Sequence, residues 1–365
     1  MHRYLVTDLV TDTGLGTIPL QGVDYSRRIN TQGDLQGEFT IGSSVHADLA
    51  RLMATRPCGL YVYRGADIWW GGIVWTAYPA GGRRGTAAAC SIQAATFDSA
   101  TERRRILETL TINDTDRASA LRALWAHMQT GSGDLKVSTT TGMVGGDAWG
   151  GMWEPAQAET YQSVATEIMD TDPGFETTID VWSDDTGVRH RRLRIGTPLV
   201  GVQDTGQPPH LVATPSTVEG WGQPTDHTHR PTHAMARGAA TAKNLGGQVV
   251  PVTSPIITAK AALAEGAPRV DAVTDLPTED SSRLLQAARR LIRAPYPVPS
   301  VTVTPPEGFA WNPGLLGQLG RARIESPMFD GGVLDTVARI IGYKVQPAER
   351  GRPETITFEF QPDDI

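Results

Sequence analysis

The sequence contains little of what marks a secreted disulfide protein or a nucleic-acid-binding protein. Its only cysteines are Cys58 and Cys90, too few for a disulfide framework, although the two could pair if neighbouring strands bring them together. Charged residues make up 20% of the 365 residues and the formal net charge is −7. We therefore expect no overall electrostatic attraction to nucleic acid.

Long apolar runs are also missing. No stretch approaches the roughly 18 consecutive apolar residues of a membrane-spanning helix. The opening MHRYLVTDLVTDTG has neither the basic region nor the apolar core of a signal peptide. We therefore expect a soluble protein that is made in a cytoplasm and has no membrane span.

The motifs of common catalytic sites do not occur either. The sequence contains no Gly-x-Ser-x-Gly, no Gly-x-x-x-x-Gly-Lys-Ser/Thr and no His-Glu-x-x-His. Its carboxylates are scattered, and the adjacent pair Asp184-Asp185 falls in a predicted turn, where such a pair is usually solvated. We therefore expect a protein that is not an enzyme, with no assigned catalytic residue and no cofactor.

Glycine and proline, in contrast, are abundant. The chain has 39 glycines and 25 prolines, a larger share than the usual total of about 12%. Together with the low charge content, this composition predicts a β-dominated α+β fold with many loops. The length favours roughly two to four domains over a single core.

The pattern of apolar residues divides the chain into four parts. Alternating strands at 1–105 predict a first antiparallel β-barrel, completed by a strand near 188–201. Two amphipathic helices and a hairpin predict an α/β insertion at 106–187. The segment 202–280 is irregular and rich in proline and histidine. A helix followed by alternating strands predicts a second antiparallel barrel at 281–365.

The segment 60–79, LYVYRGADIWWGGIVWTAYP, predicts a β-hairpin with RGAD as its turn. Trp69 and Trp70 are adjacent on a strand and should point to opposite faces. We expect one ring inside a barrel and the other at a domain or subunit contact. The pair Gly71-Gly72 predicts a bulge or a sharp bend.

The motif DHTHRPTH is the main candidate for a metal site. It brings together Asp226, His227, His229 and His233, and imidazole is a good ligand for zinc or iron. No further ligand follows at a recognised spacing, and Pro231 indicates a loop. An exposed polar loop is therefore the default interpretation, and a metal-dependent hydrolase centred on this motif is an alternative.

A second alternative is a carbohydrate-binding module whose surface tryptophans stack against sugar rings. Such a platform needs exposed rings flanked by hydrogen-bonding groups. The candidate rings are Trp69, Trp70, Trp75, Trp149 and Trp153.

Several segments occur in an order that resembles a known family. They are YSRRINTQGDLQGEFTIG at 25–42, the hairpin at 60–75, RLRIGTPLVG at 192–201, and a C-terminal series from SSRLLQAARRLIRAPYPVPSVTVTP to GRPETITFEFQP. In this order and spacing the chain resembles the baseplate hub, or tail-associated (minor tail), proteins of long-tailed phages, and in particular those of phages of actinobacteria. The segment 202–280 departs from the pattern, because it has longer loops and more histidine and proline.

The resemblance implies an architecture and a set of partners. Such hubs are homotrimers in which each subunit contributes two tube-like β-barrels to a ring. The ring adapts the sixfold tail tube to threefold tip structures, and it closes or lines the DNA-exit channel. The implied partners are the distal tail protein, the C-terminus of the tape-measure protein, tip, spike or fibre proteins, and phage DNA that passes without specific binding. The implied location is the tail tip of a virion that is assembled in the cytoplasm of a bacterial host.

Overall fold

The computed structural model describes residues 2–81, 88–131, 134–139, 148–169, 175–196, 199–201, 208–222, 231–243, 249–276, 278–292 and 300–361. The chain forms two compact units. The first contains Met1–Ala165, Glu176–Gly222 and Pro299–Ile365, and the second contains Thr166–Phe175 and Gln223–Val298. Within the described part of the chain, no helix is long and apolar enough to cross a membrane.

A sheet of 13 strands is the main element of the first unit. Seven of its strands come from the N-terminal part of the chain: β1 (His2–Thr7), β2 (Gly14–Ile18), β3 (Gln21–Arg28), β4 (Asp34–Thr40), β5 (Cys58–Arg64), β6 (Asp67–Ala80) and β7 (Ala89–Thr96). The other six are β13 (Leu211–Ala213), β14 (Val218–Gly222), β19 (Ser300–Val303), β20 (Leu319–Glu325), β21 (Val333–Gln346) and β22 (Thr355–Gln361).

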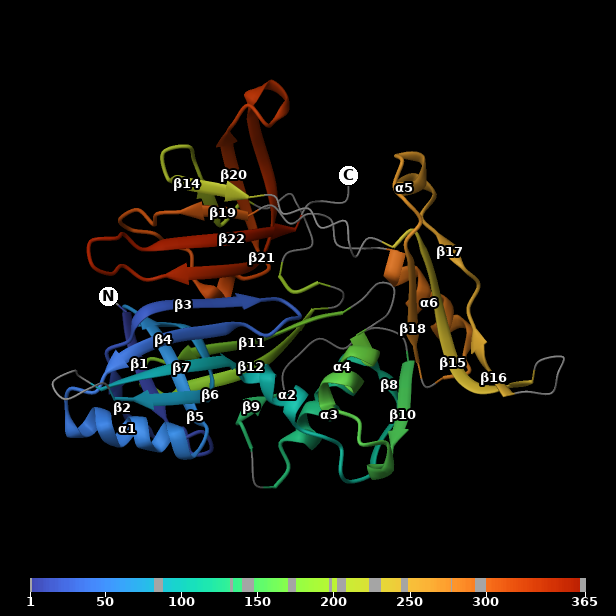
Figure 1. The fold of residues 1–365 in the computed structure, drawn as a ribbon, viewed down its shortest axis with the longest axis horizontal. Helices are drawn as coiled ribbons and strands as arrows, with labels where there is room; N and C mark the ends of the chain where they lie inside the picture. The colour runs from blue at the N-terminus through green and yellow to red at the C-terminus, as the bar shows by residue number, and fades with distance from the viewer. Residues whose placement is uncertain are drawn as a thin grey trace. The chain divides into compact units, whose positions relative to one another are not determined.

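The two ends of the chain meet inside this sheet. Its strand order is β14-β19-β22-β21-β3-β4-β7-β6-β5-β1-β2, and β20 and β13 extend it from β21. Gly342 to Val345 of β21 pair antiparallel with Arg28 to Tyr25 of β3 (Figure 1). The fold is β-dominated and largely antiparallel, as predicted. Among the described strands, however, the two predicted closed barrels are not found. Strands from both predicted barrels instead share this 13-stranded sheet, in which β3 pairs with β4 on one edge and with β21 on the other.

The predicted hairpin at 60–79 is present as β5 and β6, and Gly65 adopts φ +65° in its turn. Its bulges differ from the prediction. Trp69 is the extra residue in the pairing of β6 with β5, and Trp75 is the extra residue in the pairing of β6 with β7. The Gly71-Gly72 pair lies between these two bulges. The absence of a side chain at Gly72 allows the backbone of Ala95 to pack directly against it.

One helix lies in a segment for which the strand pattern makes no prediction. Ser43 caps the N-terminus of the helix α1 (Ser44–Thr55), and its side chain accepts a hydrogen bond from the backbone N–H of His46. Leu49 and Met53 are buried four residues apart on the helix. This apolar face packs against β6 and β2, so that α1 covers the N-terminal strands (Figure 1).

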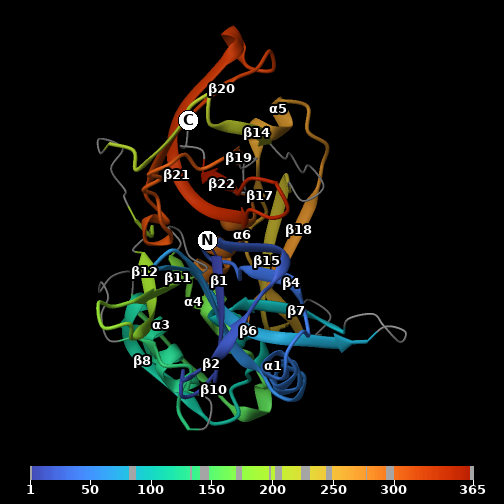
Figure 2. The ribbon, with the colours of Figure 1, turned by 90° about the vertical axis from the view of Figure 1, so that its left-hand side faces the viewer.

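The predicted insertion contains short sheets and helices. In it, α3 (Arg117–Met128) packs against a two-stranded sheet of β8 (Leu110–Asp116) and β10 (Ala148–Trp153) (Figure 2). A three-stranded sheet contains β9 (Val137–Ser138), β11 (Glu176–Ser183) and β12 (Arg189–Gly196). The strand expected near 188–201 is therefore β12, whose partners are β11 and β9. The chain also contains shorter elements, some inside and some outside this insertion: α2 (Ala100–Arg103), α4 (Tyr161–Met169) and the 3-10 turns η1 (Phe97–Ser99), η2 (Pro155–Gln157), η3 (Pro313–Leu315) and η4 (Asp330–Gly332).

The second unit has its own small core. In the segment expected to be irregular, β15 (His233–Lys243) pairs with β16 (Val249–Thr253), β17 (Ile257–Thr258) and β18 (Asp271–Asp275). The short helix α5 (Lys260–Ala264) follows β17. The helix α6 (Ser281–Ile292) matches the predicted helix, and it buries Leu284, Ala287 and Ala288 against Ala236 of β15.

Replacing Gly72 by alanine should destabilise the first unit strongly. An added Cβ would lie 2.2 Å from the carbonyl oxygen of Ala95 and 2.5 Å from the ring of Trp70. Such overpacking costs about 1–3 kcal/mol, or more where the obstacle is backbone. We expect urea denaturation of Gly72→Ala to show a loss of about 3 kcal/mol. The control Gly42→Ala, with nothing within 4 Å of the added carbon, should change stability by less than about 0.5 kcal/mol. Equal stability of Gly72→Ala and wild type would contradict this packing.

Candidate functional site

Four buried aromatic rings join the N-terminal strands to the C-terminal strands. Trp69 of β6 meets Trp311 and Tyr343 edge to face, with ring centroids 5.7 Å and 6.3 Å away. Trp311 also packs against Phe358 of β22 at 4.8 Å. At most 2% of each of these residues is exposed. We call these four residues, Trp69, Trp311, Tyr343 and Phe358, the aromatic joint, and edge-to-face pairs of this kind stabilise beyond the area that they bury.

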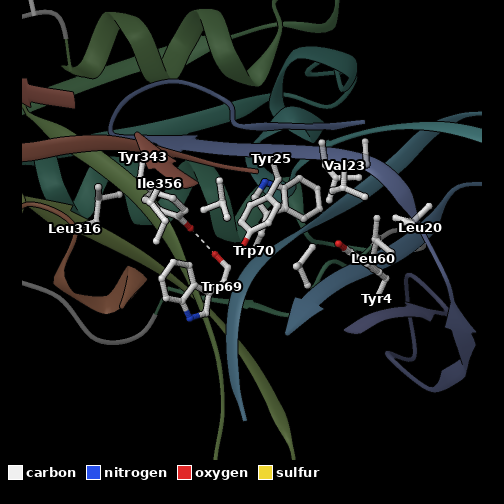
Figure 3. Packing of buried hydrophobic residues seen from close by; sticks show 14 of the residues in the cluster. Tyr4, Leu20, Val23, Tyr25, Leu60, Trp69, Trp70, Leu316, Tyr343 and Ile356 are labelled. Carbon is white, nitrogen blue, oxygen red and sulfur yellow. Dashed lines mark hydrogen bonds between the residues drawn. The ribbon is translucent and has the colours of Figure 1, made fainter. Parts of the chain in front are cut away.

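A hydrogen bond fixes the aromatic joint in place. The hydroxyl of Tyr343 donates to the backbone carbonyl of Trp69 (Figure 3). Burial raises the pKa of Tyr343 to about 12, so the hydroxyl keeps its proton and remains a donor at neutral pH. The bulge at Trp69 leaves this residue outside the regular pairing of β6 with β5.

The adjacent tryptophans of the hairpin, Trp69 and Trp70, lie in a single hydrophobic core. Trp70 is fully buried, and its indole N–H donates to the carbonyl of Ser26 on β3 at 2.9 Å. Trp69 contacts residues from the C-terminal strands, so one expected role, contact between two parts of the chain, is present. Neither ring lies at a subunit surface, since both are buried within the isolated chain.

A charged group covers one side of the aromatic joint. The guanidinium of Arg64 lies 4.6 Å from the centre of the Trp69 ring. It also forms a two-pronged ion pair with Glu354, with N–O distances of 2.9 Å and 3.0 Å. Arg64 ends β5 and Glu354 precedes β22, so this pair also fastens the two ends of the chain together.

His2 completes this group from β1. Its Nε2 atom lies 3.1 Å from the hydroxyl of Tyr25 and 3.6 Å from Glu354. Burial lowers the pKa of His2 to about 4, although Glu354 acts in the opposite direction. His2 is therefore neutral at pH 7, and its contact with Glu354 is not an ion pair under that condition.

Further buried polar contacts connect the large sheet to β11 and β12. Arg27 of β3 donates to Thr178 at 2.8 Å and to Asp180 at 2.9 Å. Arg191 of β12 donates to Asp12 at 2.7 Å, in the turn between β1 and β2. Because these guanidiniums are buried, loss of either carboxylate would leave an unpaired charge in the interior.

The structure contradicts the proposed platform of surface tryptophans. Trp69 and Trp70 are buried, and so are Trp149 and Trp153, whose rings stack on each other at 5.3 Å. Trp75 is half-buried, and its indole N–H donates to Ser99 at 2.8 Å. The four buried rings present no face to a sugar, because other side chains of the same chain fill the space around them.

The candidate metal motif falls mostly outside the described residues. This holds for Asp226, His227 and His229, whereas His233 begins β15, with its ring 3.2 Å from the hydroxyl of Thr232. Among the residues that the structure describes, no three His, Cys, Asp or Glu side chains gather closely enough to hold a metal ion.

The two cysteines are buried and unpaired. Cys58 lies on β5 and Cys90 on β7, with β6 between them in the sheet. Burial raises the pKa of both thiols, which disfavours the reactive thiolate. The pairing that the sequence left open is therefore not formed.

Residues that the sequence did not single out complete the joint. Tyr343 lies in the segment IIGYKV of β21, within the part of the chain where alternating strands were predicted, and its large apolar ring was the only local indication that it is buried. Trp311 lies in a loop, where no periodicity marks it as buried. Arg64 and Glu354 are 290 residues apart in the sequence, so no local pattern indicates that they pair.

The chain resembles known proteins in its fold, although not in its sequence. No protein-family model matches the chain, and no curated protein matches it in sequence. A tail protein from Neisseria meningitidis superposes with a TM-score of 0.60 at 13% identity, over 99% of this chain and 97% of that one. The 43 kDa tail protein of prophage MuSo2 from Shewanella oneidensis gives 0.59 at 11% identity, over 99% and 98%. The chain has the fold of phage tail proteins.

The likeness extends to a secretion component. An Escherichia coli protein superposes with a TM-score of 0.50 at 9% identity, over 95% of this chain and 74% of that one. It is described as part of the type VI secretion system and as structurally similar to tail proteins of bacteriophage T4.

Truncating Trp69 should weaken the connection between the two ends of the chain. A buried tryptophan replaced by alanine costs about 3–5 kcal/mol of the free energy of unfolding. We expect this loss for Trp69→Ala in chemical denaturation. Tyr78→Ala is a control on the same strand, since Tyr78 is 68% exposed and its loss should cost less than about 0.5 kcal/mol. Equal effects of the two changes would show that the aromatic joint does not stabilise the fold.

The low pKa of His2 predicts a dependence of stability on pH. The unfolded chain, with a histidine pKa near 6.5, binds more protons than the folded chain between pH 6.5 and about 4. Stability should therefore fall as the pH is lowered through this window, by up to about 3 kcal/mol from His2 alone. In denaturation curves measured from pH 7 to pH 4, His2→Gln should show a shallower decline than wild type. Parallel pH profiles would rule out this role of His2.

Proposed function

We propose that the protein is a structural component of a phage tail, and more specifically a baseplate hub at the tail tip. One observation carries the proposal. The fold likeness to two phage tail proteins covers nearly the full length of this chain and of both relatives. A likeness that included only one sheet would support a shared domain, whereas this one includes both compact units.

The architecture suits a part that holds its shape rather than one that performs chemistry. The largest buried side chains, including the aromatic joint, fill the core, so these rings are not available to a ligand. The contacts that link distant segments are packed rings, the buried ion pair of Arg27 with Asp180 and the half-buried ion pair of Arg64 with Glu354. In our proposal the protein is therefore not an enzyme, and the rigid sheet itself carries out the function.

The proposed assembly is a homotrimeric ring at the virion tail tip. The ring would adapt the sixfold tail tube to threefold structures and close or line the DNA-exit channel. The resemblance of the segment order to hub proteins supports this arrangement. It also supports the distal tail protein, the tape-measure C-terminus and tip, spike or fibre proteins as neighbours. The net charge of −7 is compatible with a channel through which DNA passes without binding.

Removing the gene from the phage that carries it should abolish infective tailed particles. We expect a plasmid copy of the wild-type gene to restore plaques, and the Tyr78→Ala copy to do the same. The Trp69→Ala copy should restore far fewer, because its fold is destabilised. A tagged protein should be found by immunogold electron microscopy at the tail end distal to the capsid.

Two results would count against the proposal at different levels. Infective tailed particles without the protein would overturn a structural tail role. A cryo-electron microscopy map of the tail tip that contains a copy number other than three would overturn the trimeric ring but keep the tail role. A map is preferred to mass measurement of the isolated protein, because a hub can assemble only on its neighbours.

A further inference from the structure

Four arginines converge beside β11 in the first unit. Arg27 from β3 lies 2.9 Å from Asp180, and Arg192 and Arg194 from β12 lie 3.4 Å and 3.3 Å from the same carboxylate. Arg339 from β21 pairs with Glu176 at the start of β11, at 2.6 Å. We call Arg27, Arg192, Arg194 and Arg339 the arginine cluster.

The cluster has more positive than negative charge. Guanidinium groups stay protonated in proteins, so the four arginines carry four charges. Among the described residues that form ion pairs with them, the opposing charges are those of Asp180 and Glu176. Asp98 also lies near Arg27, and burial raises the pKa of this carboxyl group. Within the described residues, the four arginines outnumber their two ion-paired carboxylates by two.

The neighbouring arginines disfavour the charged form of Arg194. Burial is the main cause that lowers the pKa of Arg194. The charge of Asp180 acts in the opposite direction, and the nearby charges of Arg27, Arg192 and Arg339 lower the pKa further. Packing like charges together in a partly buried place is unfavourable unless an anion offsets them. A negatively charged ligand would therefore offset the excess positive charge of the arginine cluster.

Unused hydrogen-bond donors point to the same conclusion. Arg339 is 5% exposed, and its Nε and Nη1 atoms are buried without a hydrogen-bond acceptor. The Nε atom of Arg194 likewise lacks an acceptor in hydrogen-bond geometry. Buried donors in native proteins nearly always have a partner. The side chain of Arg192 is 43% exposed and that of Arg194 is 20% exposed, so the cluster reaches solvent.

We propose that the arginine cluster binds a small oxyanion of the phosphate class. Several guanidiniums around one tetrahedral oxyanion satisfy its oxygens with charge-assisted hydrogen bonds. The bound anion would offset the surplus charge and supply acceptors for the unused N–H groups. Because it would bridge β3, β12 and β21, it would stabilise the first unit where the ends of the chain meet. This inference is independent of the role in a phage tail.

The test uses the full chain with inorganic phosphate as the probe. Thermal unfolding and isothermal titration calorimetry are measured in phosphate and in chloride at equal ionic strength. We expect the Tm to rise with phosphate concentration and to reach a plateau, because binding to the folded state alone saturates. General salt stabilisation by phosphate, in contrast, keeps increasing with concentration.

Two matched variants distinguish phosphate binding at the arginine cluster from binding at other arginines. Arg192→Gln removes the most exposed member of the cluster and should weaken phosphate binding at least tenfold, with an unchanged circular dichroism spectrum. Arg321→Gln removes a similarly exposed arginine that is paired with Asp335 on the C-terminal strands, and it should bind phosphate like wild type. The absence of saturable phosphate binding by wild type, or an equal loss of binding in both variants, would overturn the proposal.

Discussion

The pairing of β3 with β21 is the constraint on which the rest of the first unit depends. It joins Arg28–Tyr25 to Gly342–Val345 in one hydrogen-bonded ladder, and it makes a single sheet from strands at both ends of the chain. The aromatic joint lies beside this ladder, since Tyr343 is part of it and reaches Trp69. Packing and backbone pairing therefore reinforce each other at one place.

The polar contacts show a similar division of roles. Arg64 and Glu354 connect the termini on one side of the joint, whereas Arg27 and Asp180 connect the sheet to β11. Buried ion pairs add little net stability compared with apolar packing, but a misplaced partner is costly. A strand register that separated Arg27 from Asp180 would leave a buried charge unpaired, so this pair disfavours such registers.

Local signals in the sequence predicted the strongly periodic elements, but they missed α1 and the strands within 202–280, and they did not predict how the elements assemble. Alternation identified the strands of the 60–79 hairpin, and the 3.6-residue period identified α3 and α6. The joining of the two expected barrels was not predictable, since an edge strand such as β3 carries no mark of its second partner. Trp149 and Trp153 are buried on β10, which packs against α3, and the sequence of β10 alone does not indicate this partner.

The β3–β21 ladder also affects the order in which the sheet can form during synthesis of the chain. More than three hundred residues separate its two strands, so during synthesis the N-terminal strands emerge long before their partner exists. Until then the edge of β3 is unpaired, and Trp69 lacks Tyr343 and Trp311. Contacts between such distant parts of a chain form slowly, and open strand edges invite pairing with other chains. The N-terminal strands therefore have an exposed edge until the C-terminal strands have been synthesised and can pair with it.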